Sequence, residues 1–165
     1  MTTVTKDQLD SIEILLKTEV SPDVLRSVEE KYSNRKLVLN KDSKLEEADF
    51  NLFFQYGMLL IQSKYKSDWP KGRELMEDLY IKSDDAVAKR DYLFYCSIAE
   101  TKMKNYPAAL KFVKSILYVE PFNVQAQALE QYISGKKERD LLIGAGAIGG
   151  LGLVGIMLLS GLSKR

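Results

Sequence analysis

The chain of 165 residues carries 24 Lys and Arg against 23 Asp and Glu, and it contains no histidine. Histidine is the commonest general base and metal ligand, so its absence argues against nucleophile–base pairs and metal sites, and we expect no enzyme, metal or cofactor. The balanced charge likewise gives no basic face for nucleic acid.

The cysteine count and the chain length limit what can fold. A single cysteine, Cys96, cannot form an intramolecular disulfide, and its apolar neighbours predict a buried small hydrophobic residue, not a reactive thiol. About 135 residues precede an apolar tail, which is enough for one domain with a moderate core.

Residues 1–20 are expected to form an N-terminal arm. They contain no basic patch followed by an apolar stretch, so we predict no secretory signal and a cytosolic soluble part. Apolar residues recur at helical spacing and predict a short amphipathic helix; they are Leu9, Ile12, Leu15 and Leu16. This helix should end before Ser21 and Pro22, where serine can cap a second helix and proline can occupy its first turn.

The rest of the soluble part reads as helical. A second helix is predicted to carry its apolar stripe from Val24 to Tyr32, and the polar segment 33–44 is predicted to be a loop. No run alternates with period two, so we expect an all-α domain over residues 21–135.

A repeat of about forty residues begins after Lys44. Two helical hairpins are predicted, with small residues at matching positions where paired helices can approach closely; these are Gly57 with Ser97, and Gly72 with Ala109. Pro121 should stop the fourth hairpin helix, and a capping helix should follow over residues 123–134. This is the tetratricopeptide pattern, although two repeats are fewer than the three usually needed, so flanking helices must cover the exposed faces.

The tail is predicted to be a membrane anchor. Residues 141–162 are uncharged, and as a helix they rise about 33 Å, enough to cross a hydrocarbon core of about 30 Å. A juxtamembrane linker, 136–140, should precede this transmembrane helix, and a basic tip, 163–165, should follow it. Basic residues at both ends favour the mitochondrial outer membrane, although they could simply fix the depth of any span.

Glycines in the tail match the G-x-G-x-x-G pattern of dinucleotide-binding folds. No acidic residue follows at the required distance, so we interpret them as glycines of a transmembrane helix. Gly146 and Gly150 form a small-xxx-small pair that could bring two anchors together as a homo-oligomer, or could simply moderate the hydrophobicity of the span.

Three segments precede the Gly-rich anchor and the basic tip; they are Arg90-Asp-Tyr-Leu-Phe-Tyr, Tyr106-Pro-Ala-Ala-Leu-Lys-Phe-Val and Glu120-Pro-Phe-Asn-Val-Gln-Ala-Gln-Ala-Leu-Glu. In this combination the chain resembles the mitochondrial fission 1 family. The resemblance implies a six-helix bundle facing the cytosol from the mitochondrial outer membrane, and often from peroxisomes. It also implies a receptor for a soluble fission adaptor and a dynamin-like GTPase, with an arm that can lie over the concave face.

The first helix of each hairpin should line a concave groove for a partner helix. Counting from Gly57 and Ser97 places ten residues along this groove, and they include Asn51, Gln62 and Asp91. The residues predicted to bind the partner are Phe54, Met58, Ile61, Phe94, Ile98, Thr101 and Lys102. Exposed apolar side chains along this groove would have to be covered, either by a partner or by the N-terminal arm itself. The alternative is that these side chains pack between helices as core.

A tail-anchored co-chaperone or import receptor is the competing function. Its groove would clamp the carboxylate of an extended peptide C-terminus and would need several converging cations or amides. Lys102 is the only cation predicted there.

Overall fold

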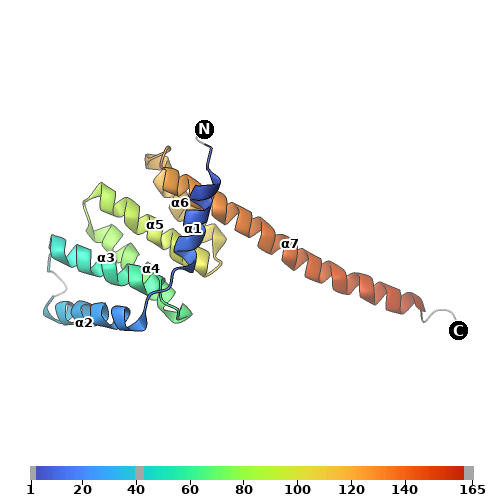
Figure 1. The fold of residues 1–165 in the computed structure, drawn as a ribbon, viewed down its shortest axis with the longest axis horizontal. Coiled ribbons are helices and arrows are strands. Elements are labelled where there is room, and N and C mark those ends of the chain that lie inside the picture. Colours follow the sequence, from blue (N-terminus) through green and yellow to red (C-terminus); the bar gives the residue numbers. More distant parts are fainter. Residues whose placement is uncertain (1–2, 40–42, 162–165) are drawn as a thin grey trace. The chain divides into compact units, whose positions relative to one another are not determined.

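The computed structural model describes residues 3–39 and 43–161, and residues 145–161 by their backbone alone. These residues form α-helices and one 3-10 helix without a strand, which confirms the all-α prediction (Figure 1). The helices are α1 Lys6–Lys17, α2 Pro22–Val38, α3 Glu47–Ile61, η1 Lys66–Asp68, α4 Trp69–Lys82, α5 Ala86–Lys102, α6 Tyr106–Val119 and α7 Val124–Gly161. The chain divides into two compact units, Met1–Ile133 and Ser134–Arg165.

Helix α1 forms within the predicted arm and begins with a capping box. The Thr5 hydroxyl accepts a hydrogen bond from the Gln8 N–H at 3.3 Å, and the Gln8 side chain accepts one from the Thr5 N–H at 2.8 Å. After α1, the Val20 N–H donates to the main-chain oxygen of Gln62 at 3.0 Å. The connection to α2 is therefore tied to the C-terminal end of α3.

Helix α2 continues beyond the predicted start of a loop at residue 33. The ring of Tyr32 lies 4.8 Å from that of Phe53 and 4.5 Å from that of Tyr56, both on α3. One turn later, Arg35 makes a paired hydrogen bond to Asp49, a carboxylate only 3% exposed. The loop prediction was wrong for residues 33–38 because these contacts with α3 favour continued helix in a polar sequence.

Helices α3 and α4 form the first hairpin and touch through glycine. A Cβ on Gly72 would lie 2.7 Å from the main-chain oxygen of Gly57, so the two backbones are in direct contact. The connection is ordered by Ser63, whose main-chain oxygen accepts from the Trp69 indole at 2.8 Å and whose hydroxyl donates to Asp68 at 2.8 Å. These bonds hold the short 3-10 helix η1 against the start of α4.

Helices α5 and α6 form the second hairpin. Ser97 and Ala109 are both fully buried, and the Ser97 hydroxyl donates to the main-chain oxygen of Ala109 at 3.0 Å. The small side chains thus allow α5 and α6 to pack closely, and the hydroxyl is satisfied at the contact. Pro121 follows α6 in the turn before α7.

The N-terminal part of helix α7 packs on the helical domain after the second hairpin. Its first turn is capped by Asn123, and Ala126, Leu129 and Ile133 are fully buried in the first unit. The sequence predicted a capping helix, a juxtamembrane linker and a transmembrane helix as three segments. In the structure, α7 is one continuous helix to Gly161. No helix among the fully described residues is long and apolar enough to cross a membrane. The anchor predicted over 141–162, including Gly146 and Gly150, lies largely outside those residues.

Candidate partner-binding surface

The seven residues predicted to line the groove fall into two groups. Phe54, Met58, Phe94 and Lys102 are partly exposed, and they belong to α3 and α5. Ile61 and Ile98 are 0% and 1% exposed, and Thr101 is buried with its hydroxyl donating to the main-chain oxygen of Ser97. These three are core residues, so the exposed part of the predicted surface is smaller and more aromatic than the sequence suggested.

Aromatic rings form the centre of this surface. Phe54 on α3 lies 5.5 Å from the ring of Tyr92 and 5.4 Å from that of Tyr95, and Tyr95 lies 5.9 Å from Phe94. Such tilted and edge-to-face pairs fix the rings relative to one another. Repeat-position counting stepped over both tyrosines, although the run Tyr92-Leu-Phe-Tyr95 was visible in the sequence. Tyr95 is partly exposed and belongs to the surface, whereas Tyr92 is 3% exposed and supports Phe54 from the core.

Lys102 has a structural role in this region. Its ammonium group donates to the main-chain oxygen of Ile61 at 2.7 Å and lies 4.8 Å from the centroid of the Trp69 ring. Burial lowers the pKa of this lysine, because the charged form loses hydration. An ammonium already engaged by protein groups is poorly placed to clamp a peptide carboxylate, which weighs against the co-chaperone reading.

The arm packs on the same bundle. Ile12 is 5% exposed in the main hydrophobic cluster, and Leu15 and Leu16 are partly buried against it. Leu9 is half-buried, whereas Ile14, on the opposite face of α1, is 66% exposed. Helix α1 therefore presents an apolar face to the folded domain and a polar face with one exposed isoleucine to solvent.

A cavity of about 330 Å³ remains where the arm crosses α5 and the start of α7. It is bounded by Ile12 and Leu15 on α1, Phe94 and Tyr95 on α5, and Ala128 on α7. The arm thus lies beside Phe94 and Tyr95 and leaves space between itself and these two rings. An apolar side chain from a partner would fit between the arm and α5.

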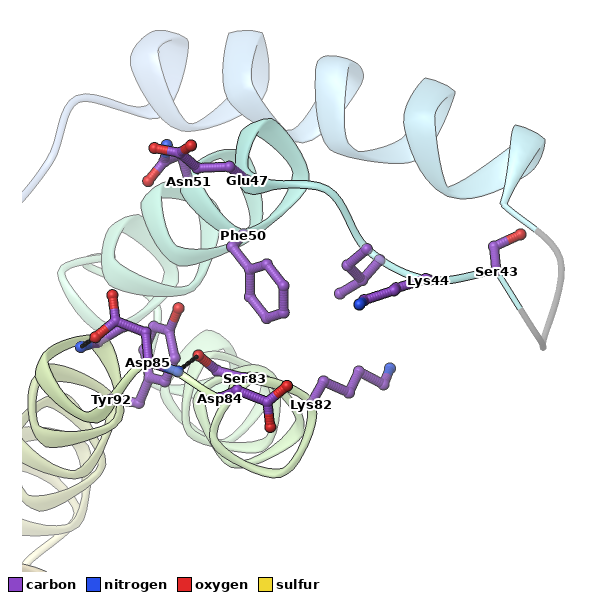
Figure 2. A pocket seen from close by; sticks show the side chains of 12 residues that line it. Ser43, Lys44, Glu47, Phe50, Asn51, Lys82, Ser83, Asp84, Asp85 and Tyr92 are labelled. Carbon is purple, nitrogen blue, oxygen red and sulfur yellow. Dashed lines mark hydrogen bonds between the residues drawn. The ribbon is translucent and has the colours of Figure 1, made fainter.

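A second, larger hollow of about 610 Å³ lies at the N-terminal ends of α3 and α5 (Figure 2). Phe50 and Tyr92 form its apolar wall, and Asn51, which repeat counting placed in the groove, also lines it. Asp85 lies at its rim, but one of its carboxylate oxygens caps α5 by accepting from the Val87 and Ala88 N–H groups. This hollow continues the aromatic surface beyond Phe54.

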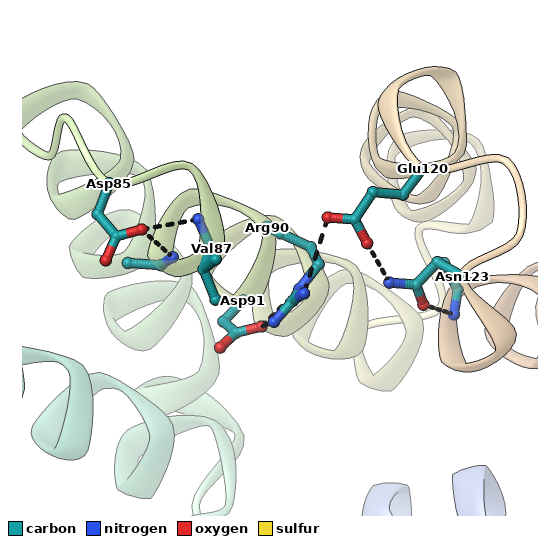
Figure 3. Close-up of polar contacts among 8 residues, drawn as sticks. Asp85, Val87, Arg90, Asp91, Glu120 and Asn123 are labelled. Carbon is teal, nitrogen blue, oxygen red and sulfur yellow. Dashed lines mark hydrogen bonds and ion pairs between the residues drawn. The ribbon is translucent and has the colours of Figure 1, made fainter.

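Charged residues near the start of α5 hold helices together (Figure 3). Arg90 donates to Asp91 at 2.9 Å and pairs with Glu120 at 3.7 Å. Glu120 in turn accepts from the Asn123 amide at 2.8 Å, and Asn123 caps α7. Asp91, which repeat counting placed in the groove, is therefore part of a network joining α5, α6 and α7.

The described residues offer little for chemistry. Cys96 is fully buried, and burial raises the pKa of its thiol to about 12, so the nucleophilic thiolate is scarce at neutral pH. No group of three or more Cys, Asp and Glu side chains that could hold a metal occurs in the part of the chain that is described. The arrangement instead suits binding of an apolar, helical segment.

Comparisons with known proteins identify the family. Residues 90–142 match the model of the Fis1 C-terminal tetratricopeptide repeat. The mitochondrial fission 1 protein of Homo sapiens is 34% identical over 154 residues, covering 92% of this chain and 96% of the relative, and that of Bos taurus gives the same values. The chain belongs to the mitochondrial fission 1 family.

Solved structures agree on the fold. Yeast Fis1 in complex with an Mdv1 fragment containing the N-terminal extension and coiled coil domains matches with a TM-score of 0.62 and 20% identity. That match covers 76% of this chain and 91% of the yeast chain. Members of the family are non-enzymatic, tetratricopeptide-like adaptor receptors, which confirms the expectation that this chain is not an enzyme.

Proposed function

We propose that this chain is a receptor of the mitochondrial outer membrane that promotes fission by binding a soluble adaptor between the α1 arm and the aromatic surface of α3 and α5. A dynamin-like GTPase would be recruited through the adaptor or directly. The observation that carries the proposal is the partly covered aromatic surface with its cavity of about 330 Å³ under the arm. An apolar patch with open space between it and the arm suits an amphipathic partner helix.

The tail supplies the location in this proposal. Residues 141–162 would span the outer membrane once, with residues 1–135 in the cytosol, the linker 136–140 between them and the tip 163–165 beyond. Fixing the domain at a surface raises its local concentration for a partner that arrives from solution. Peroxisomal membranes are a second expected location, and close packing at Gly146 and Gly150 would make the receptor a homo-oligomer.

Affinity purification from mitochondrial membranes tests the receptor function. The full chain should co-purify with a dynamin-like GTPase or a soluble fission adaptor, identified and quantified by mass spectrometry. Met58→Glu and Phe94→Glu place a charge on the proposed surface, and each should reduce recovery at least about tenfold, or about 1.4 kcal/mol. Circular dichroism should show that the helices persist.

Leu37→Glu provides the matched control. Leu37 is 84% exposed near the end of α2, away from the aromatic surface, so its substitution should leave recovery unchanged. Absence of both partner classes would overturn the receptor function. Equal recovery with all variants would instead show that the partner binds elsewhere.

A further inference from the structure

The face of α3 that carries the aromatic surface continues one helical turn beyond it. Phe50, Phe54 and Met58 are spaced by four residues, so they follow one stripe of α3. Phe50 lines the hollow of about 610 Å³ at the N-terminal ends of α3 and α5, which we call the terminal hollow (Figure 2). On α5, Tyr92 lines the same hollow, and its ring lies 5.5 Å from that of Phe54. A segment that follows the stripe therefore reaches the terminal hollow.

Acidic groups border the terminal hollow on two elements. The three carboxylates that line it come from Glu47 at the start of α3 and from Asp84 and Asp85 before α5. No ion pair in the described part of the chain involves any of them. Asp85 caps α5 through one oxygen, Oδ1, which leaves its other oxygen for a ligand.

Two cations also line the terminal hollow, but they lie on its other side. Figure 2 shows Lys44 and Lys82 together, across the hollow from Glu47 and Asp85. Lys82 pairs with Asp78 at 3.8 Å, and Asp78 is not part of the lining. Of the charges outside ion pairs, three are therefore acidic and one, that of Lys44, is basic.

The acidic side of the hollow is also its aromatic side. Burial, and next the charge of Asp85, raise the pKa of the Tyr92 phenol, which places this carboxylate near the ring. Phe50 faces the hollow from α3 (Figure 2). Aromatic rings and unpaired carboxylates thus border the same space.

We propose that the terminal hollow binds an arginine side chain of the adaptor segment, an inference that rests on the function proposed above. A guanidinium stacks on aromatic rings through its plane and pairs with carboxylates through its N–H groups. Phe50 would contact the plane, and Asp84 and Asp85 would accept the N–H groups. An apolar side chain would instead remove water from these carboxylates without pairing them, and an acidic one would be repelled.

An arginine in the terminal hollow would fix the direction of the adaptor segment. Toward the other end of the groove lies Lys102, whose ammonium group is held by the main-chain oxygen of Ile61. A basic residue at that end would meet a like charge, so the reversed orientation is disfavoured. The groove therefore has an acidic end and a basic end, and a partner with arginine at one end binds in one direction.

The test uses the full chain in neutral phosphatidylcholine nanodiscs and two fluorescent peptides. Each peptide has about eighteen residues, roughly 27 Å as a helix, with Leu and Phe on one face. Two positions at one end carry arginine in the first peptide and citrulline, an uncharged analogue of similar shape, in the second. Fluorescence anisotropy should show that the arginine peptide binds at least about fivefold more tightly.

Neutral substitutions of similar size make the test specific. Asp84→Asn with Asp85→Asn removes two charges, while asparagine still caps α5. In this double variant, the arginine peptide should bind within about twofold of the citrulline peptide, whose own affinity should stay unchanged. The matched control is Asp23→Asn with Glu30→Gln, which removes two exposed charges of α2 and changes the net charge equally. It should keep the full preference for arginine.

Crosslinking tests the direction of binding. A benzophenone beside the two arginines should crosslink within residues 43–51 or 82–92, which include the lining of the terminal hollow. A benzophenone at the other end of the peptide should crosslink closer to Lys102. Crosslinks within residues 43–51 from both ends would overturn the proposed direction.

Four results would overturn the arginine site. They are equal binding of both peptides to the wild type, a preference that survives in the Asp84 and Asp85 double variant, an equal loss in the control variant, and no binding of the arginine peptide up to about 100 μM.

Met58→Glu separates this proposal from the receptor function. It lies on the aromatic surface and should weaken both peptides by at least about tenfold. Such a loss, together with equal binding of both peptides to the wild type, would remove only the arginine site. A preference for arginine in a chain that recovers neither adaptor nor GTPase from membranes would keep the site and remove the receptor function.

Discussion

Gly72 of α4 lies so close to Gly57 of α3 that a Cβ on Gly72 would sit 2.7 Å from the Gly57 main-chain oxygen and 2.7 Å from Cγ1 of Ile61. Main-chain atoms cannot move aside without shifting the helix. A Cβ on Gly57 would instead meet Cε of Met76 at 3.0 Å, the flexible end of a side chain. The two glycines therefore differ in how much substitution they tolerate.

We expect Gly72→Ala to destabilise the domain by about 2–3 kcal/mol and Gly57→Ala by about 1 kcal/mol, because overpacking between helices forces backbone shifts. Gly135 provides the control, since nothing lies within 4 Å of a Cβ built there. Gly135→Ala should be neutral or stabilising by up to about 1 kcal/mol. Urea unfolding of the three variants checks the order, and equal values at positions 72 and 135 would contradict it.

The ion pair between Arg35 and Asp49 predicts sensitivity to acid. The hydrogen-bonded Arg35 guanidinium holds the pKa of the Asp49 carboxyl below its ordinary value of 3.8. Because the unfolded state then binds more protons near that pH, the pair stabilises the fold above about pH 4 and is lost as pH falls through the lower folded pKa. Asp49→Asn should lower the unfolding temperature at pH 7 and should reduce the loss of stability on going to acid pH. An unchanged dependence of the unfolding temperature on pH in the acid range would show that other carboxyls produce that loss.

The buried thiol of Cys96 predicts that the stability of the fold decreases at alkaline pH. Its folded pKa of about 12 exceeds the ordinary value of 9.0, so above pH 9 the unfolded state loses a proton that the folded state keeps. Stability should therefore fall between about pH 9 and pH 12. Relative to Cys96→Ala, the wild type should lose roughly 2 kcal/mol by pH 10.5. Unfolding curves of both proteins at pH 8 and 10.5 measure the difference, and parallel profiles would contradict it.

Local pattern predicted the helical class and the small residues at the hairpin contacts, because both depend on spacing along the chain. The end of α2 was missed because it depends on Tyr32 meeting two rings of α3, a contact between distant segments. Ile61 and Ile98 were placed in a groove because repeat counting gives a direction from the helix axis. It does not say whether another element covers that direction.

The last prediction concerns how firmly the arm is held. Burial of an isoleucine contributes about 1.5–3 kcal/mol, so Ile12 accounts for a large share of the docking of α1. A charge buried at that position would cost more than this, so Ile12→Asp should release α1 while the hairpins stay folded. Hydrogen exchange should then show loss of protection in residues 6–17 and retained protection in α3–α6. Ile14→Asp, at a site 66% exposed, should leave protection unchanged both in α1 and in α3–α6.

The same variant tests the role of the arm in adaptor binding. If the adaptor shares its docking surface with the arm, Ile12→Asp will weaken adaptor binding, whereas an arm that only covers the surface will give tighter binding. Protected amides throughout α1 in Ile12→Asp would mean that the arm is held by contacts other than Ile12.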